Sequence, residues 1–414
     1  MEESTRAFSL DDVQSALGKA GLSGWLFYDF RGLDPVARKI LCLDPEHVGT
    51  RRWFYFVPAQ GEPRKLVHAI EPAMLATLPG STEVYLSWQS LRSGLEGILT
   101  GSGRVAMQYS PKNEVPYVSR VDGGTLELVR SFGTEVVSSA DLVQDFDATL
   151  TLPQLESHHE AANLLRMLID EVFFKVAEAV RAGRKLDERD VLTIVEKRLS
   201  ANELVYDHPP IVAVNAHAAD PHFEVPDSGS APVARGALLL VDVWAKQAAP
   251  GSIYADITWT TYVGETVPDE IVQVFEVVRD ARDATIAKAR AAFRGGTPIR
   301  GFELDRVARG VIEQAGYGEY FIHRTGHSIH EEGHGNGANL DDLETHDTRQ
   351  MLPNTLFSIE PGIYLPGRFG IRSEVNGYHT GDDLEITGPP HQDKIEALLA
   401  RPPEERMTDG SWSL

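Results

Sequence analysis

The second part of the chain shows the same order of predicted elements twice, and this repetition restricts the possible folds more than any other feature. Each copy has a long helix, a shorter helix, a loop with histidines and a pair of strands. The predicted helices and strand pairs cover residues 154–182, 187–199, 236–245 with 252–263, and then 269–293, 302–314, 355–365 with 369–375. Apolar residues at helical spacing, with glycines at the helix ends, support the helices. The repeat predicts an internal duplication, and therefore a pseudo-symmetric α/β domain in which two hairpins face each other.

The first 150 residues have a different pattern. Short aromatic-rich segments such as 25–30 and 53–58 alternate with short helical segments. This alternation is typical of an α/β domain. A chain of 414 residues is too long for one ordinary core, so we expect two domains, at residues 1–150 and 151–414. The sequence of the first domain contains no group of titratable residues with the spacing of a site.

Two pairs of acidic residues share a spacing of 14 residues: Asp242 with Asp256, and Glu360 with Glu374. Their midpoints fall in turn-like segments, at Ala249 and Gly367. In an antiparallel hairpin with its tip at the midpoint, two such carboxylates occupy paired positions on one face. Two hairpins can then bring four carboxylates together. Without cations such a site must take up protons, whereas two divalent ions cancel the charge, so the spacing predicts a metal site. The alternative, four solvated strand residues, is disfavoured by the buried-looking run 238–241 before Asp242.

The loop before the second strand pair is rich in histidine. Its sequence HRTGHSIHEEGHGNG contains His323, His327, His330 and His334. The segment 330–334 also matches the zinc-peptidase pattern HExxH, which requires a helix that presents both histidines on one face. Gly333 and the glycines that follow disfavour a helix, so we expect this match to be coincidental. A solvated polar loop is a second alternative. The corresponding loop of the first copy, VNAHAADPHFEV, contributes His217 and His222.

Composition and charge restrict the partners and the localisation of the chain. The net charge of −22 disfavours nucleic acid, because a field of that sign repels phosphate backbones. Cys42 is the only cysteine, which fits a reducing cytoplasm. The polar, acidic start lacks the basic and apolar regions of a signal peptide, and no apolar run reaches the roughly 18 residues needed to span a bilayer. We therefore expect a cytoplasmic protein that binds neither nucleic acid nor membranes.

Five motifs in the second part of the chain occur in the order seen in the pita-bread metallopeptidases. They are NAHAADPHF, VDVWA with YADITWTT, HRTGHSIHEEGH, SIEPGIY and IRSEV, and the similarity covers about residues 153 to 390. The chain resembles the branch of Xaa-Pro aminopeptidases and Xaa-Pro dipeptidases (prolidases). This resemblance implies a smaller N-terminal α/β domain of the creatinase and prolidase type, followed by a pita-bread catalytic domain. The creatinases share the fold but have lost metal ligands, which separates them from this chain.

The resemblance also implies roles for individual residues. The metal ligands would be Asp242, Asp256, His327, Glu360 and Glu374. The catalytic residues would be Glu360 as proton acceptor, His334 as donor to the oxyanion and His222 beside the scissile bond. Residues that family members use around the substrate match His323, Tyr364 and Arg372. Four carboxylates and one imidazole suit two divalent metal ions, Mn²⁺ before the alternatives Zn²⁺, Co²⁺ and Fe²⁺.

The activity that the resemblance implies is that of a metal-dependent exopeptidase. Such an enzyme hydrolyses the N-terminal Xaa-Pro bond of dipeptides or short peptides through a hydroxide that bridges the two ions. A small peptide is then the substrate, and a homodimer is implied. Ser328, Ile329 and His330 depart from the Gly-rich stretch usual in the family. A metal-dependent amidohydrolase of a small non-peptide amide therefore stays open, as do a non-catalytic peptide-binding protein and the choice between dipeptidase and aminopeptidase.

Overall fold

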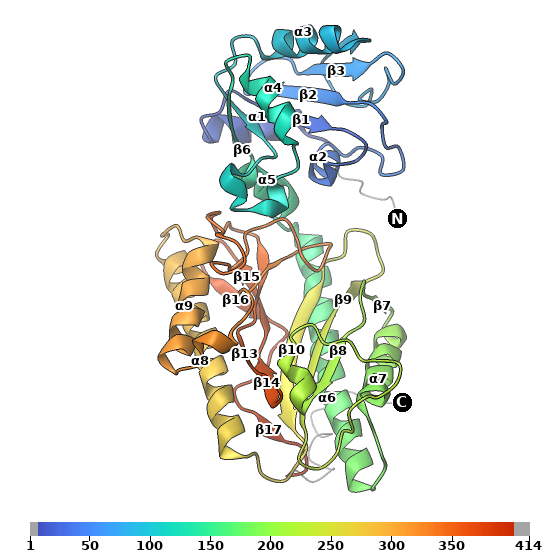
Figure 1. The fold of residues 1–414 in the computed structure, drawn as a ribbon, viewed down its shortest axis with the longest axis vertical. Coiled ribbons are helices and arrows are strands. Elements are labelled where there is room, and N and C mark those ends of the chain that lie inside the picture. Colours follow the sequence, from blue (N-terminus) through green and yellow to red (C-terminus); the bar gives the residue numbers. More distant parts are fainter. Residues whose placement is uncertain (1–6, 401–414) are drawn as a thin grey trace. The chain divides into compact units, whose positions relative to one another are not determined.

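The computed structural model describes residues 7–400, and it divides into two compact units, residues 1–148 and 149–414 (Figure 1). This division falls two residues before the boundary expected from the sequence. Each unit contains hydrophobic cores of its own. Among the described residues, no helix is both long enough and apolar enough to cross a lipid bilayer.

The first unit is a six-stranded sheet with helices on both faces. The strands are β1 (Gly24–Asp29), β2 (Trp53–Pro58), β3 (Arg64–His68), β4 (Ser81–Tyr85), β5 (Arg104–Met107) and β6 (Glu135–Ser138). Their order across the sheet is β4-β3-β2-β1-β5-β6. The helices are α1 (Leu10–Lys19), α2 (Pro35–Ile40), α3 (Trp88–Leu99), α4 (Gly123–Arg130) and α5 (Ala140–Asp147), with 3₁₀ turns η1 (Pro111–Asn113) and η2 (Pro116–Val118). Along β1, Trp25 and Phe27 pack with α1, α2 and α5, whereas Leu26 and Tyr28 pack with α3 and α4. Burial on both faces explains why this strand has no polar alternation.

The second unit contains the repeated order of elements that the sequence predicted. The first copy comprises α6 (Leu152–Arg181), α7 (Glu188–Ala201), β7 (Leu204–Val205), β8 (Ile211–Val214), η3 (Asn215–Ala219), β9 (Leu238–Gln247) and β10 (Ala255–Tyr262). The second comprises α8 (Asp269–Arg294), α9 (Gly301–Gln314), η4 (Gly318–Tyr320), β11 (Ser328–Ile329), β12 (Leu356–Ile359), β13 (Gly362–Leu365), β14 (Phe369–Arg372) and β15 (Val375–His379), followed by β16 (Leu384–Thr387) and β17 (Glu396–Ala397). All four long helices begin and end within two residues of the predicted positions.

Two helix pairs enclose the strands of the second unit, α6 with α7 on one side and α8 with α9 on the other (Figure 1). Val241 and Val243 of β9 pack into the core that contains α6 and α7. Ile363 and Ile371 of β13 and β14 pack into the core that contains α8 and α9. Because strand side chains alternate between faces, Asp242 projects away from its helix pair. The strand faces turned away from the helices are therefore available for a polar site.

Candidate metal centre

Asp242 and Asp256 lie on the antiparallel ribbon of β9 and β10, but they are not opposite each other. Thr258 is the partner of Asp242, and Trp244 is the partner of Asp256. The ribbon is therefore centred one residue beyond the expected midpoint at Ala249, and the predicted direct pairing is wrong. A register shift of two residues leaves every side chain on its original face. Both carboxylates consequently still project from one face of the ribbon.

Glu360 and Glu374 lie at two breaks in the other ribbon. The pairs β12 with β15 and β13 with β14 share one register centred on Gly367, which was the predicted midpoint. The predicted strands 355–365 and 369–375 are not continuous, because each stops at its glutamate. The backbone N–H of Glu360 donates to the carbonyl of Thr325 (2.8 Å), and that of Glu374 donates to the carbonyl of Thr258 (3.3 Å). The breaks thus join this ribbon to β10 and to the histidine loop.

The imidazole of His327 is oriented by its own surroundings. Its backbone N–H donates to the Ser358 hydroxyl (2.9 Å), and Nδ1 lies 3.2 Å from the carbonyl of Ser328. A proton on Nδ1 satisfies that carbonyl and leaves the lone pair on Nε2, the nitrogen that faces the acids. Nε2 lies 3.7 Å from Asp256 Oδ2 and 3.4 Å from Glu360 Oε1. The ring is therefore presented as a neutral ligand.

The loop that carries His327 is held by two residues of α9. Buried Asp305 accepts hydrogen bonds from the backbone N–H (2.9 Å) and the hydroxyl (2.6 Å) of Thr325. Arg309 forms an ion pair with Asp305 (2.6 Å) and donates to the carbonyls of Phe321 and His323. The irregular loop is thus fixed to a helix although it forms little secondary structure itself.

These elements gather a set of ligand atoms. Atoms of Asp256, His327 and Glu374 that could bind a metal lie within 4.8 Å of one another, and all three residues are buried. Three carboxylate oxygens have no hydrogen-bond partner in the described part of the chain although they are inaccessible: Asp242 Oδ1, Asp256 Oδ1 and Glu374 Oε1. A buried carboxylate oxygen without a donor is costly. This donor set, oxygen-rich with one imidazole, therefore fits divalent metal ions.

Burial changes the proton affinity of the same groups. Burial, followed by the charges of neighbouring carboxylates, raises the pKa of Asp256 and of Glu374 well above the usual range. Burial raises the pKa of Glu360 to about 7, although Arg372 opposes it. Burial lowers the pKa of His327 well below its usual value. The metal-free centre therefore holds protons on its carboxylates near neutral pH, while His327 stays neutral.

Three residues predicted to surround the substrate form a hydrogen-bonded chain that ends on a predicted ligand. Arg372 Nη2 forms an ion pair with Asp242 Oδ2 (2.5 Å), and Arg372 Nη1 donates to the Tyr364 hydroxyl (2.9 Å). That hydroxyl lies 2.7 Å from His323 Nε2, and His323 Nδ1 lies 2.7 Å from the carbonyl of Arg324. Burial lowers the pKa of His323 to about 3 and raises that of Tyr364 to about 12. Tyr364 therefore donates to a neutral His323, and the chain fixes one oxygen of Asp242.

The two predicted catalytic histidines lie in different environments. His334 is packed against His327, with ring centroids 4.2 Å apart, and burial lowers its pKa to about 4. His222 is exposed on the loop that follows β8. The carbonyl of Pro221, directly before it, accepts from Arg372 Nη1 (3.3 Å), the side chain that pairs with Asp242.

The segment that matches HExxH is not helical. It forms a series of bends, in which the His330 N–H donates to the carbonyl of Glu332 (3.1 Å). The carbonyl of His330 accepts from the N–H of Tyr254. His330 and His334 therefore do not share a helix face, and the helical zinc-peptidase alternative is excluded.

Three further polar residues that were not predicted form hydrogen bonds with the predicted ligands. Each lies two positions from a predicted ligand: Ser358 before Glu360, Thr258 after Asp256, and Asn376 after Glu374. Ser358 donates to Glu360 (3.1 Å), Thr258 donates to Glu374 (2.8 Å), and Asn376 accepts from the N–H of Asp256 (3.0 Å). Strand alternation around each predicted ligand was the signal that could have identified them.

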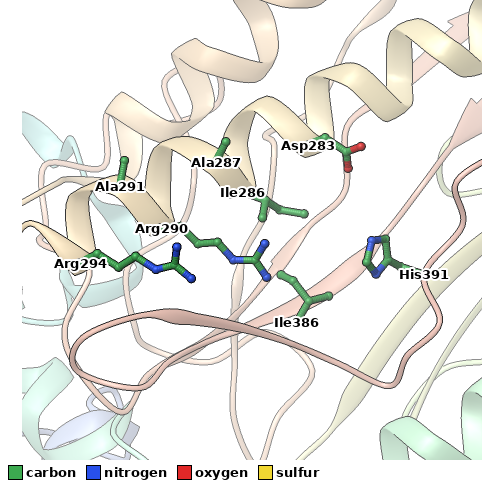
Figure 2. Close-up of a pocket in the computed structure, with 8 residues that line it drawn as sticks. All are labelled: Asp283, Ile286, Ala287, Arg290, Ala291, Arg294, Ile386 and His391. Carbon is green, nitrogen blue, oxygen red and sulfur yellow. The ribbon is translucent and has the colours of Figure 1, made fainter.

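A separate groove lies along the second half of α8 (Figure 2). It has a volume of about 480 Å³ and is lined by Asp283, Ile286, Ala287, Arg290, Ala291, Arg294, Ile386 and His391. None of the predicted ligands or catalytic residues contributes to it. The groove is therefore not part of the metal centre.

Comparison with known proteins agrees with this arrangement. The model of metallopeptidase family M24 matches residues 156–381, which is more than half of the chain. The probable dipeptidase PepE of Mycobacterium tuberculosis is 31% identical over 277 residues, covering 64% of this chain and 66% of that protein. The Xaa-Pro dipeptidase of Lactobacillus delbrueckii subsp. lactis is 35% identical over 249 residues, covering 60% and 62%. The chain thus aligns with slightly less than two thirds of the length of these relatives.

The fold is shared with solved structures. The X-prolyl aminopeptidase of Caenorhabditis elegans, described as a cytosolic enzyme with a di-nuclear active site, has a TM-score of 0.59 at 16% identity, covering 94% of this chain and 64% of that one. The predicted pseudo-symmetric pita-bread fold, preceded by a smaller α/β domain, is confirmed. The ribbons, the histidine loop and the match over residues 156–381 together show that the chain belongs to metallopeptidase family M24.

Proposed function

We propose that this metallopeptidase is a dinuclear-metal exopeptidase that hydrolyses the N-terminal Xaa-Pro bond of dipeptides or short peptides. The observation that carries the proposal is the set of buried carboxylate oxygens of Asp242, Asp256 and Glu374 that lack hydrogen-bond donors beside His327. A relative named Xaa-Pro dipeptidase and a structural neighbour named X-prolyl aminopeptidase support the choice of bond.

Five residues would hold the two divalent ions: Asp242, Asp256, His327, Glu360 and Glu374. When bound, the ions would lower the pKa of a coordinated water towards about 7, so that hydroxide would be available at neutral pH. Mn²⁺ is the expected metal, because four carboxylates form a hard ligand set, and Zn²⁺, Co²⁺ or Fe²⁺ are the alternatives.

Glu360 is suited to accept the proton of the attacking water. In the metal-free protein, burial raises its pKa to about 7, so this carboxylate takes up a proton more readily than an exposed glutamate does. The hydroxyl of Ser358 donates to Glu360 Oε1 (3.1 Å) and so fixes one carboxylate oxygen. The other oxygen is then the one that takes the proton.

His334 and His222 would act on the two sides of the scissile bond. With a pKa of about 4, His334 is neutral at pH 7 and donates one N–H to the carbonyl oxygen on which charge develops. The exposed loop position of His222 gives it access to the leaving nitrogen, which in a proline bond is tertiary and needs a proton. Arg372, Tyr364 and His323 keep Asp242 in place through their hydrogen bonds.

The altered loop sequence does not favour the amidohydrolase alternative. The hydroxyl of Ser328 accepts the N–H of Gly337 (3.0 Å), and Ser328 is buried. This departure from the Gly-rich stretch closes the loop on itself, and its side chain is not offered to a substrate. No observation favours a non-catalytic peptide-binding role.

Partners and localisation follow from the same proposal. We expect a cytoplasmic homodimer that binds a small peptide and binds neither nucleic acid nor a membrane. The net charge of −22 supports the exclusion of nucleic acid. Sedimentation as a monomer at micromolar concentration would contradict the dimer.

The test uses metal-loaded protein with Xaa-Pro dipeptides, Xaa-Pro-Yaa tripeptides and matched Xaa-Ala peptides. We expect cleavage of the proline peptides before the proline, and loss of cleavage after chelation with recovery on adding Mn²⁺. Cleavage of dipeptides alone identifies a dipeptidase, and cleavage of tripeptides identifies an aminopeptidase. Equal turnover of the alanine peptides, or turnover that survives chelation, contradicts the proposal.

A further inference from the structure

Glu188, the first residue of α7, is a fully buried carboxylate that the proposed mechanism does not use. Its Oε1 accepts the backbone N–H of Val214 (2.8 Å), and its Oε2 accepts the backbone N–H of Ala231 (2.8 Å). The Nδ1 of His217 lies 2.9 Å from Oε1 and 3.0 Å from Oε2. Three donors thus surround one buried carboxylate, and these hydrogen bonds offset the free-energy cost of burying its charge.

The donors belong to the segment that leads to His222. Val214 ends β8, and His217 lies in η3, five residues before His222. The ring of His217 stacks on the ring of Phe223, with centroids 4.4 Å apart and planes at 24°. Glu188 therefore fixes the start of the loop directly, and through the His217 ring it fixes the residue next to His222.

The opposite side of the same loop rests on β14. Arg372 Nη1 donates to the carbonyl of Pro221 (3.3 Å), directly before His222. A Cβ at Gly370 would come within 1.8 Å of the carbonyl of Ala218, so β14 and the loop are in backbone contact. Arg372 also binds Asp242. The position of His222 is thus set between Glu188 on one side and the strand that supports a metal ligand on the other.

We propose that Glu188 is a positioning residue that holds His222 at the metal centre through Val214, His217 and the His217–Phe223 stack. This inference rests on the proposed function only in assigning His222 to the leaving nitrogen. It explains why a charged side chain is buried at the start of α7, where an exposed acid would cap the helix equally well. It also gives a role to His217, which the metal centre does not use.

The Glu188→Gln variant keeps the shape of the side chain but turns an NH₂ group towards one of the three donors. We expect kcat for a proline dipeptide to fall about 10- to 100-fold, as for other residues that orient catalytic groups, with little change in KM. In a His222→Ala background the same substitution should cause no further loss, because its effect passes through His222. Equal losses in both backgrounds would overturn the inference.

Two further variants separate positioning from folding. Asp190 is an exposed acid in the same first turn of α7, and its carboxylate accepts the N–H of Asp187. The Asp190→Asn variant should leave kcat unchanged. His217→Phe keeps a ring against Phe223 but removes the donor to Glu188. It should lower kcat as Glu188→Gln does, and normal kcat in this variant contradicts the inference. If the Glu188→Gln variant does not fold, the His217→Phe variant still tests the inference.

A readout without turnover distinguishes this inference from the proposed function. In metal-free protein labelled at histidine carbons, the resonance of His222, assigned by its loss in His222→Ala, should shift in Glu188→Gln and not in Asp190→Asn. A shift in a protein that cleaves no proline peptide leaves the positioning inference standing and rejects the proposed function. An unmoved resonance rejects the positioning role whatever the activity.

Discussion

Thr258 donates its hydroxyl proton to Glu374 across 2.8 Å, and this bond joins the two ribbons that carry the four predicted carboxylate ligands. The same hydroxyl oxygen accepts Nε of Arg372 (3.0 Å), the side chain that pairs with Asp242. Thr258 itself lies opposite Asp242 in the β9–β10 register. One small polar side chain therefore orients groups on both ribbons, although it binds no metal itself.

Replacement of Thr258 by valine should weaken metal binding more than it weakens the fold. The substitution keeps the branched shape but removes the donor to Glu374 and the acceptor for Arg372. We expect Mn²⁺ affinity to fall about 10- to 100-fold, measured by calorimetric titration. Thr261→Val is the matched control, because Thr261 is buried on the same strand and donates to the carbonyl of Glu396. Equal affinity loss in both variants would contradict the assignment.

The Glu360→Gln variant should fold normally and lose most turnover. An amide cannot accept the proton of the attacking water, and a general base commonly contributes about 10²- to 10⁴-fold to the rate. We expect a loss in kcat of that order on a proline dipeptide at saturating Mn²⁺. Glu385→Gln, an acid on β16 outside the metal centre, is the control and should keep wild-type turnover. Near-normal turnover by Glu360→Gln would reject its role as proton acceptor.

Metal binding should release protons and weaken as the pH falls. Burial raises the pKa of Glu360 to about 7 and the pKa values of Asp256 and Glu374 well above the usual range. Below pH 7 the ions must displace protons from these carboxylates, so apparent affinity should fall about tenfold per pH unit for each proton displaced. Calorimetry at pH 6 in buffers of different ionisation enthalpy measures the protons released. An affinity that does not change between pH 6 and 8 would contradict these raised pKa values.

His158 should make stability depend on pH. It is fully buried on α6, where its Nδ1 lies 2.7 Å from the carbonyl of Tyr254 and its Nε2 lies 2.7 Å from the Thr387 hydroxyl. Burial lowers the pKa of His158 from 6.5 to about 4. The unfolded chain therefore binds a proton that the folded chain excludes, and stability falls as the pH drops from 6.5 to 4, by about 3 kcal/mol.

The comparison with His158→Gln isolates this contribution, because every other titrating group is common to both proteins. Urea unfolding of the metal-free proteins at pH 7 and pH 4.5 should show a larger loss of stability in the wild type than in the variant. An identical pH dependence in the two proteins would show that His158 is not the group responsible.

The sequence predicted the strand face of the acidic residues better than it predicted the course of the backbone. Asp242 and Asp256 were predicted to lie on one face because strand side chains alternate every two residues. The predicted pairing was wrong by two residues, and a shift of two leaves both side chains on that face. The break at Glu360 was not predicted, because it depends on the bond from its N–H to Thr325, which lies 35 residues earlier. Strand propensity contains no information about such distant partners.

The buried acids that support the loops were beyond prediction for the same reason. Glu188 follows a helix-capping aspartate and reads as an ordinary first-turn acid. Its partners Val214 and Ala231 lie 26 and 43 residues further along the chain. Asp305 likewise binds Thr325, 20 residues away. Only the folded structure reveals that these carboxylates point inward and hold loops.

Neither copy of the repeated element set contains all five predicted metal ligands. The first contributes Asp242 and Asp256, and the second contributes His327, Glu360 and Glu374. Bound cations would therefore connect the two copies, each of which has its own helices and apolar core. Removal of the cations should weaken the contact between β10 and β15 before either copy unfolds. Amide hydrogen exchange of these two strands would therefore report whether the metal ions are bound, without any peptide substrate.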